Sequence, residues 1–467
     1  MQALTQLSFC RSLMVCGLVL ALAGCGGGGS TADEGVVGSA ECSVDAQKTW
    51  LSGYMEEWYF WNRITPRPAP AANQSVADYF NALLYTGTDP AFPADRWSGS
   101  QSTESYNRFF GDGQTLGYGI SVAGLEILDS PNEPLRVRYV EPASPAATAG
   151  VRRGDQVLTL NGRPAAEVVA ANDFAALTAD AAGQTLVLRL RNVAGAERTA
   201  TITSAIFALT PLPQDQVVNS PNGQRLGYVV VKDMLSQVNA PLDAAFARLR
   251  TAGAQAVVLD LRYNGGGLVS ASGTVASYLA GTRGQGQIYT SLLYNDRRAG
   301  TNNNVFRFSA QSQAIQAPRV YVLTGERTCS ASEQLINGLR GVGVDVVTIG
   351  DATCGKPFGF LPAARCGTTY RVVNFESVNA RGEGRYFDGF AATCRVAEDF
   401  RQSLGSSTEP LLAAALAHAD TGVCPAAAAA AVAGEGQAKA LAARSRADRA
   451  DRPRVRDGGE APGMLGR

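Results

Sequence analysis

The chain has 467 residues, of which 45% are hydrophobic, so it is long enough to form two or three domains with buried cores. Its 41 basic residues balance its 41 acidic residues, which argues against a nucleic acid or another polyanion as a partner. The single histidine, His418, lies in an Ala- and Leu-rich helical segment, where we expect it to face solvent. Sites that need a catalytic histidine or several metal-binding histidines are therefore disfavoured.

Residues 1–24 have the features of an export signal. An apolar run from Leu13 to Gly24 is shorter than the roughly 20 residues that a membrane-spanning helix needs. The run ends Leu-Ala-Gly before Cys25 and resembles a bacterial lipoprotein signal that is cleaved before the cysteine. The resemblance implies that Cys25 carries a lipid and that residues 25–41 form a flexible tether. It also implies a place in the cell envelope, on the periplasmic side of a bacterial membrane, with the lipid as the sole membrane contact. An ordinary cleaved signal peptide is the alternative, and it too implies export.

Residues 42–110 are predicted to form a small helical domain. Aromatic residues cluster between Trp50 and Trp61, prolines then interrupt the pattern, and a second helix is expected at Ser75–Tyr85. A cluster of this kind is more typical of a core than of a binding site.

Residues 111–207 alternate between strands and turns, with a strand expected at Ile120–Ile127 and a helix near Ala171–Thr178. The segments LGYGI, SPAATAGVRRGD and VLTLNG follow one another in an order that resembles a PDZ domain of the circularly permuted bacterial type. The resemblance implies a groove in which backbone N–H groups hold a peptide carboxylate and a strand edge holds the peptide. The residues of this groove would be Gly117, Tyr118, Gly119 and Ile120. A PDZ fold that acts only as a spacer or lid is the alternative.

Residues 208–424 show the strand-and-helix alternation of an α/β domain. The run Ala254–Leu261 is almost wholly apolar, as expected for a strand buried on both faces, and it leads into a glycine-rich turn and a helix. Residues 425–467 are Ala-rich and then charged, with no aromatic residue, and are predicted to be a disordered tail.

Two residues of the α/β domain have the chemistry of a nucleophile and its base. Ser330 lies among small residues before a helical run, and Lys356 lies in a glycine-bounded turn after a β-branched strand, Val344–Ile349. A serine hydroxyl needs a base, histidine is disfavoured here, and Ser-Lys pairs are an established substitute. A lysine has a pKa of about 10.4, which burial would have to lower by about 2–3 units for work near neutral pH.

Three motifs in order, LDLRYNGGG at 259–267, SASE at 330–333 and Gly355-Lys356, resemble the carboxyl-terminal processing peptidases. The resemblance covers roughly residues 42–424. It implies a crotonase-like α/β protease core with an inserted or preceding PDZ domain and an N-terminal helical domain. It further implies a serine endopeptidase that recognises unstructured protein or peptide C-termini through the PDZ groove and needs no cofactor or metal.

The resemblance assigns roles to single residues: Ser330 as nucleophile, Lys356 as general base, and the N–H groups of Ala331 and Gly266 as the oxyanion hole. Many family members have a glutamine four positions after the lysine that orients it, and this chain has Phe360 there. Glu333, one helical turn from Ser330, is the candidate for the orienting role. A charge that complements the helix dipole is its alternative role.

Export also bears on the cysteines. Six lie beyond Cys25, an even number in an oxidising compartment, and 15 pairings are open. We predict the pairs Cys329–Cys354, Cys366–Cys394 and Cys42–Cys424. The first pair follows from the dyad, because contact between the serine and the lysine would bring their neighbours together. The scattered spacing has no CxxC pair, so a metal site is disfavoured.

Other functions compete with the peptidase. The main alternative is a catalytically inactive PDZ-containing scaffold that binds peptides, because the orienting glutamine is missing. A Ser-Lys acyl hydrolase acting on cell-wall peptides has no SxxK motif in its favour. Residues 350–356 match the phosphate-loop pattern GxxxxGK, but Pro357 stands where a nucleotide site needs Ser or Thr for magnesium.

Overall fold

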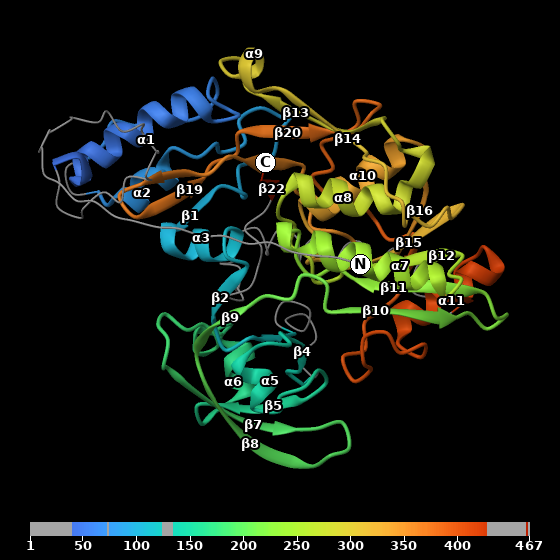
Figure 1. The fold of residues 1–467 in the computed structure, drawn as a ribbon. Helices are drawn as coiled ribbons and strands as arrows, with labels where there is room; N and C mark the ends of the chain where they lie inside the picture. The colour runs from blue at the N-terminus through green and yellow to red at the C-terminus, as the bar shows by residue number, and fades with distance from the viewer. Residues whose placement is uncertain (1–39, 72–73, 124–133, 427–463, 466–467) are drawn as a thin grey trace, which may run out of the picture. The chain divides into compact units, whose positions relative to one another are not determined.

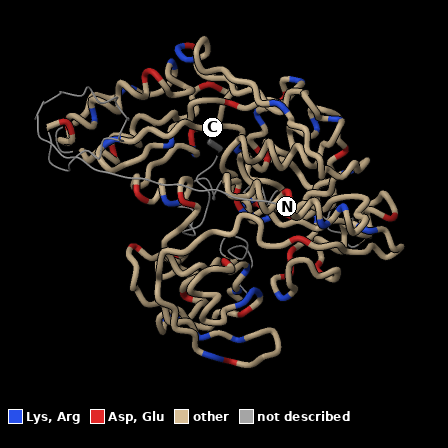
Figure 2. The backbone as a smooth tube through the Cα atoms, in the orientation of Figure 1, with Lys and Arg blue, Asp and Glu red and all other residues tan. Residues whose placement is uncertain are grey.

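The structure, a computed structural model, describes residues 40–71, 74–123, 134–426 and 464–465 (Figure 1). The predicted export signal, Cys25 and most of the predicted tail lie outside these residues. Within the described part of the chain, no helix has both the length and the apolar character needed to cross a membrane. Figure 2 shows acidic and basic residues mixed along the backbone.

The N-terminal domain is helical, as the sequence predicts. Its elements are η1 (Ala40–Cys42), α1 (Val44–Trp58), α2 (Val76–Ala82) and α3 (Thr103–Phe110). Ser43, Ser75 and Ser102 each accept a backbone N–H of the first turn and so fix where these α-helices begin. The aromatic cluster is a core, as expected, and it is shared with Phe358 and Tyr370 from later in the chain.

The PDZ-like module follows, built on a four-stranded antiparallel sheet in the order β6-β5-β7-β8 with two further strand pairs, β2–β9 and β3–β4. Side chains of β7 and β8 alternate between buried and exposed, as in a sheet with one solvated face. Within 171–178, where one helix is expected, the structure has only the short η2 (Ala175–Leu177), and α6 (Ala165–Ala170) ends just before this range. The elements are β2 (Gln114–Gly117), β3 (Ile120–Val122), β4 (Val137–Val140), α5 (Pro145–Thr148), β5 (Gln156–Leu160), β6 (Arg163–Pro164), α6 (Ala165–Ala170), η2 (Ala175–Leu177), β7 (Thr185–Arg191), β8 (Glu197–Thr203) and β9 (Ala205–Ala208).

The α/β core contains a six-stranded sheet in the order β10-β11-β12-β15-β16-β21, which is parallel except for β10. Helix α8 packs against α7 and α10, and α11 packs against β15 and β16. The central strands β12, β15 and β16 are wholly or largely buried, which explains their continuous apolar runs. The elements are β10 (Gln214–Asn219), β11 (Arg225–Val230), η3 (Ser236–Val238), α7 (Asn239–Thr251), β12 (Ala256–Asp260), α8 (Val269–Ala280), η4 (Gly281–Arg283), β15 (Arg319–Thr324), α10 (Ala331–Gly341), β16 (Asp345–Gly350), β21 (Cys394–Arg395) and α11 (Pro410–Thr421).

Two smaller sheets complete the core. One has the order β14-β13-β20-β17-β22, and the other joins β1 of the N-terminal domain to β19 and β18. The pairing of β1 with β19 attaches the helical domain to the core, because β1 lies directly before α3. The elements are β1 (Gly99–Ser102), β13 (Ile288–Tyr294), α9 (Ala299–Asn302), β14 (Asn304–Arg307), β17 (Phe358–Phe360), β18 (Ala363–Arg365), β19 (Thr368–Arg371), β20 (Phe375–Val378) and β22 (Met464–Leu465). The short strand β22 lies within residues 425–467, which the sequence predicts to be a disordered tail.

Three disulfides are present: Cys42–Cys366, Cys329–Cys354 and Cys394–Cys424. The pair predicted beside the dyad is present, whereas the predicted pairs Cys366–Cys394 and Cys42–Cys424 are wrong. Cys366 lies in the turn between β18 and β19, which the N-terminal domain covers, so its partner is Cys42. Cys394 lies in β21, close to the end of α11, so its partner is Cys424.

His418 does not face solvent, contrary to the sequence-based expectation. Only 4% of it is exposed, its ring packs against Tyr321, and burial lowers the pKa of its imidazole. Helix α11 is apolar on most of its surface, and the face that carries His418 packs on the sheet.

Candidate active site

Ser330 lies at the start of α10, directly after the loop that leaves β15. Its backbone has φ +61° and ψ −115°, a conformation that L-residues rarely adopt, and such strain is typical of functional positions. The residue is fully buried, and its Oγ has no hydrogen-bond partner within the described residues. A buried hydroxyl without a partner is costly, so this atom is a candidate for chemistry.

Glu333 connects the serine segment to the lysine segment. Its Oε2 accepts the backbone N–H of Ser330 at 2.9 Å and that of Lys356 at 2.8 Å. Its Oε1 accepts the backbone N–H of Gly355 at 2.8 Å and the hydroxyl of Thr353 at 2.6 Å. The carboxylate is fully buried, and burial raises the pKa of Glu333 although these hydrogen bonds oppose the shift. One side chain therefore fixes the relative position of two backbone segments that are 26 residues apart in the sequence.

Lys356 is buried as well, with only 7% of it exposed. Its Nζ lies 5.9 Å from the centre of the ring of Phe360, four positions later in the sequence. The lysine therefore places its amine near an aromatic ring.

The disulfide Cys329–Cys354 lies beside both dyad residues. Cys329 directly precedes Ser330, and Cys354 lies two positions before Lys356, with 5.2 Å between the two Cα atoms. The backbone N–H of Cys354 also donates to the carbonyl of Thr328 at 3.0 Å. The serine and lysine segments are thus joined by a covalent bond as well as by Glu333.

The glycine-rich turn after β12 lies against the N-terminus of α10. Gly266 has φ +104°, and a Cβ on it would lie 2.9 Å from the Cβ of Ser330 and 3.0 Å from the nitrogen of Ala331. Glycine is therefore required here for both conformation and space. Ala331 is the first residue of α10, where an N–H has no acceptor within its own helix.

The predicted second donor of the oxyanion hole has a different partner in this structure. The N–H of Gly266 donates to Oδ1 of Asn264 at 2.9 Å, so it would have to leave that acceptor to reach an oxyanion. Asn264 is fully buried, accepts the hydroxyl of Ser332 at 2.8 Å and donates to the carbonyl of Val231 at 2.9 Å. Sequence reasoning missed the role of Asn264, although it lies within the motif 259–267.

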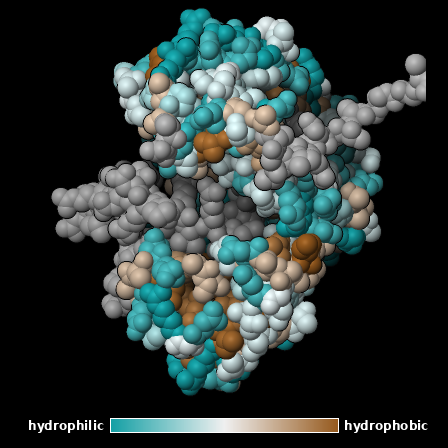
Figure 3. All heavy atoms as spheres, turned by 90° about the vertical axis from the view of Figure 1, so that its left-hand side faces the viewer, coloured by the Kyte–Doolittle hydropathy of each residue, from teal (hydrophilic) through white to brown (hydrophobic). Residues whose placement is uncertain are grey.

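The four predicted peptide-binding residues, Gly117 to Ile120, line one groove of the PDZ-like module. Gly119 has φ +77°, and a Cβ on it would lie 2.0 Å from the Cβ of Ser144, so only glycine fits. Apolar side chains line much of the groove, and Figure 3 shows apolar side chains gathered on the part of the surface that this module forms. Lys232, Tyr263 and Arg327 of the α/β core also line the groove, which sequence reasoning did not predict.

Comparison with known families finds three matches along the chain. Residues 225–361 match peptidase family S41, residues 46–99 match the peptidase S41 N-terminal domain, and residues 136–192 match the PDZ domain. Over these residues the chain is similar to peptidase family S41. The family match spans the glycine turn, Ser330 and Lys356.

Among solved structures, the chain is similar to a putative S41 protease from Bacteroides fragilis, with a TM-score of 0.63 and 25% sequence identity. The match covers 80% of this chain and 97% of that one. The fold is thus a mixed α/β S41 protease fold with an N-terminal helical domain, a PDZ domain and a protease core.

Among curated relatives, the chain is 28% identical to the carboxyl-terminal-processing protease of a Picosynechococcus species, over 51% of this chain and 54% of the relative. It is 30% identical to carboxyl-terminal-processing peptidase 1, chloroplastic, of Arabidopsis thaliana, over 51% of this chain and 47% of the relative. The chain spans about half the length of the curated relatives it matches.

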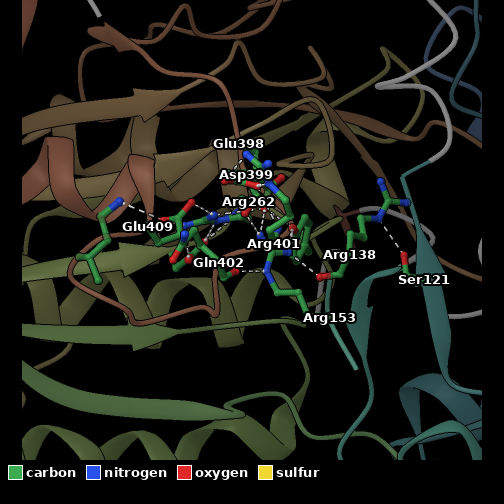
Figure 4. Close-up of polar contacts among 12 residues, drawn as sticks. Ser121, Arg138, Arg153, Arg262, Glu398, Asp399, Arg401, Gln402 and Glu409 are labelled. Atoms are coloured by element: carbon green, nitrogen blue, oxygen red, sulfur yellow. Dashed lines mark hydrogen bonds and ion pairs between the residues drawn. The ribbon is translucent and has the colours of Figure 1, made fainter. Parts of the chain in front are cut away.

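An ion network connects the PDZ-like module to the α/β core (Figure 4). Arg153 of the PDZ domain donates to Glu398 at 2.8 Å and to the carbonyl of Gln402 at 2.8 Å. Arg262 donates to the same Glu398 at 3.2 Å and to both oxygens of Glu409, at 2.8 and 2.9 Å. Burial opposes the charge on Glu409, but Arg262 holds the pKa of its carboxyl below the usual value. Arg262 lies two residues before Asn264, so the network reaches the glycine-rich turn.

Proposed function

We propose that this S41 protein is an exported serine endopeptidase in which Ser330 is the nucleophile and Lys356 the general base. The observation that carries the proposal is the single oxygen of Glu333 that accepts the backbone N–H groups of both residues. This contact joins the backbone segments that carry the buried hydroxyl and the buried lysine, and a Ser-Lys pair needs no catalytic histidine.

The chemistry follows from these positions. The neutral amine of Lys356 takes the proton of the Ser330 hydroxyl as Oγ attacks the carbonyl carbon of the scissile bond. The N–H of Ala331 and a donor of the glycine-rich turn stabilise the oxyanion, typically by several kcal/mol. The lysine then gives its proton to the departing amine, which leaves an acyl-enzyme. A water molecule, deprotonated by the lysine, hydrolyses the acyl-enzyme and restores the serine.

Glu333 acts as a positioning residue in this proposal. It contacts the backbone of the dyad residues and so fixes the distance over which the proton moves. Errors of about 1 Å in such a distance cost on the order of 100-fold in rate.

The PDZ groove supplies recognition of the substrate. The Gly117–Ile120 loop and the cationic residues beside it are suited to a free C-terminal carboxylate, and the apolar lining is suited to the side chains that precede it. We infer that unstructured protein or peptide C-termini are the partners. Three disulfides favour an oxidising compartment, and the sequence up to Cys25 favours a lipid anchor on the periplasmic side of a membrane.

A second function, a peptide-binding scaffold without catalysis, is favoured by one observation. The N–H of Gly266 donates to Asn264, so the oxyanion hole lacks a ready second donor. This function predicts that C-terminal peptides bind but that Ser330 does not react with serine-directed reagents.

Cleavage of an unstructured peptide that carries either a free or an amidated C-terminus tests the peptidase proposal. We expect the wild-type protein to cleave the free form, to cleave the amidated form with a lower kcat/KM, and to lose cleavage with Ser330→Ala. The exposed Ser236, changed to alanine, is the matched control and should behave like wild type. Unchanged cleavage by Ser330→Ala would exclude the proposed nucleophile, and equal cleavage of both peptides would exclude recognition of the carboxylate.

A further inference from the structure

The strand β17 lies beside the dyad, and a distant segment of the chain pairs with its outer edge. β22 (Met464–Leu465) runs parallel to β17, with Met464 opposite Gly359 and Leu465 opposite Phe360. β22 is the end strand of its sheet, so β17 would be the edge strand without it. Figure 1 draws β22 next to the mark of the C-terminal end.

The backbone of β17 shows why this edge attracts a partner. The carbonyls of Pro357 and Gly359 accept N–H groups of Ser377 and Asn374, both at 2.9 Å, on the β20 side. Backbone groups alternate along a strand, so those of Phe358 and Phe360 face the opposite edge. The three residues of β17 are buried, and a buried edge without a partner leaves N–H and C=O groups unsatisfied.

This edge is close to the chemistry. β17 begins two residues after Lys356, and the ring of Phe360 lies 5.9 Å from the lysine Nζ. The backbone N–H of Lys356 is fixed by Glu333, so the start of β17 is fixed relative to Ser330. An extended segment paired with β17 therefore runs past the general base.

We propose that the edge of β17 is the site at which the enzyme holds an extended substrate segment by strand addition, and that β22 occupies this site as an intramolecular competitor. Main-chain hydrogen bonds supply affinity in such pairing, whatever the sequence of the added strand. The role of the site in substrate binding rests on the proposed peptidase activity, whereas its occupation by β22 does not. A tethered segment has an effective concentration on the order of 1 mM, so even weak pairing competes with dilute substrate.

Peptide cleavage by the full chain tests the competition. The double substitution Met464→Pro with Leu465→Pro removes two N–H groups and disfavours pairing. We expect KM for an unstructured peptide to fall about two- to tenfold with kcat unchanged, because a competitor at the above effective concentration is lost. The pair Ala440→Pro with Leu441→Pro changes a similar dipeptide away from β22 and should leave KM at the wild-type value.

Binding to an inactive protein tests the site independently of catalysis. A labelled peptide with the sequence of residues 460–467 should bind to the Ser330→Ala protein that also carries the proline pair at 464 and 465. Fluorescence anisotropy should show weaker binding to Ser330→Ala alone, in which β22 is intact. Hydrogen exchange at the amides of Phe358 and Phe360 should be faster with the proline pair and slower again after the peptide is added.

The outcomes separate the two proposals. If wild type cleaves peptides, the proline pair leaves KM unchanged and the peptide does not bind, the strand site is wrong and the peptidase stands. If no variant cleaves but the peptide binds and protects both amides, the peptidase proposal is wrong. The proposal that β22 occupies the edge of β17 is then supported. Exchange at Phe358 and Phe360 that the proline pair does not alter would overturn the occupation by β22.

Discussion

Two buried glutamates are held in contrasting ways. Glu333, between the dyad segments, accepts four hydrogen bonds, so both of its oxygens are satisfied. Glu141, which lines the PDZ groove, has one oxygen with no partner within the described residues, and it lies near Lys232 and Asp233. Burial raises the pKa of both carboxyls, in Glu141 to about 7.

The difference indicates which part of the molecule is fixed and which part responds to conditions. A carboxylate surrounded by N–H and O–H donors is an anchor, because removing it leaves several buried donors without an acceptor. A partly satisfied carboxyl that titrates near neutral pH changes its charge under ordinary conditions. We therefore expect the groove to respond to pH through Glu141.

The largest expected effect follows from changing the anchor. Glu333→Gln replaces one carboxylate oxygen by an NH₂ group that faces N–H donors of the dyad segments. An NH₂ group offers these donors no acceptor, so their hydrogen bonds are lost. We expect kcat to fall about 100-fold through misplacement of the dyad, and the free energy of unfolding to fall by about 2–4 kcal/mol. The exposed Glu104, changed to glutamine, is the control in peptide-cleavage kinetics and urea unfolding. A Glu333→Gln protein with wild-type kcat would show that the carboxylate does not position the dyad.

The second-largest effect is expected for Asn264, which holds the glycine-rich turn of the site in place. Asn264→Ala leaves the N–H of Gly266 without its acceptor and removes one of the two acceptors of the Ser332 hydroxyl, which keeps the backbone carbonyl of residue 264. We expect kcat to fall about 30-fold with KM nearly unchanged, because the glycine-rich turn loses its support. A rise in kcat would instead indicate that Asn264 blocks the oxyanion hole.

The disulfide beside the dyad can be compared with one far from it in its effect on kcat and on stability. Replacing Cys329 and Cys354 by alanine should lower kcat about fivefold, because the covalent link between the dyad segments is lost. The loop of 25 residues that this bond closes predicts a stability loss of about 3–4 kcal/mol.

The pair Cys42–Cys366, which closes 324 residues, is the control for that experiment. Its replacement should cost more stability, about 5–6 kcal/mol by loop entropy, and leave kcat unchanged at temperatures where the variant stays folded. Equal effects of both replacements on kcat would show that the bond beside the dyad has no specific role.

The smallest expected effect is the pH response of Glu141. The folded protein keeps a proton on this carboxyl up to a pH of about 7, whereas the unfolded chain loses it near 4.5. Stability therefore falls as pH rises from about 4.5 to 7, and the full cost, about 3 kcal/mol at most, is present above 7. Urea unfolding at pH 5 and pH 8 should show this loss in wild type and a smaller loss in Glu141→Gln. Equal losses in both proteins would show that Glu141 titrates normally.

The sequence predicted those parts of the site that have a local signature. Ser330, Lys356 and Glu333 lie in short motifs, and the structure places all three segments together. The sequence alone could not predict the pairing of the other four cysteines. The partner of Cys366, for example, depends on how β1 of the helical domain pairs with β19. The burial of His418 was missed because a helix rich in alanine shows little difference between its faces. Asn264 was missed because its partners, Val231 and Ser332, are distant in sequence and carry no motif that connects them to it.

The central claim is that Ser330 is an activated nucleophile. Its most direct test is reaction with a serine-directed phosphonate, followed by mass mapping of the adduct in wild type, Ser330→Ala and Lys356→Met. We predict one adduct, on Ser330, in wild type and none in either variant, because the hydroxyl is unreactive without its base. A wild-type protein that stays unlabelled, or that is labelled on another serine, would contradict the account.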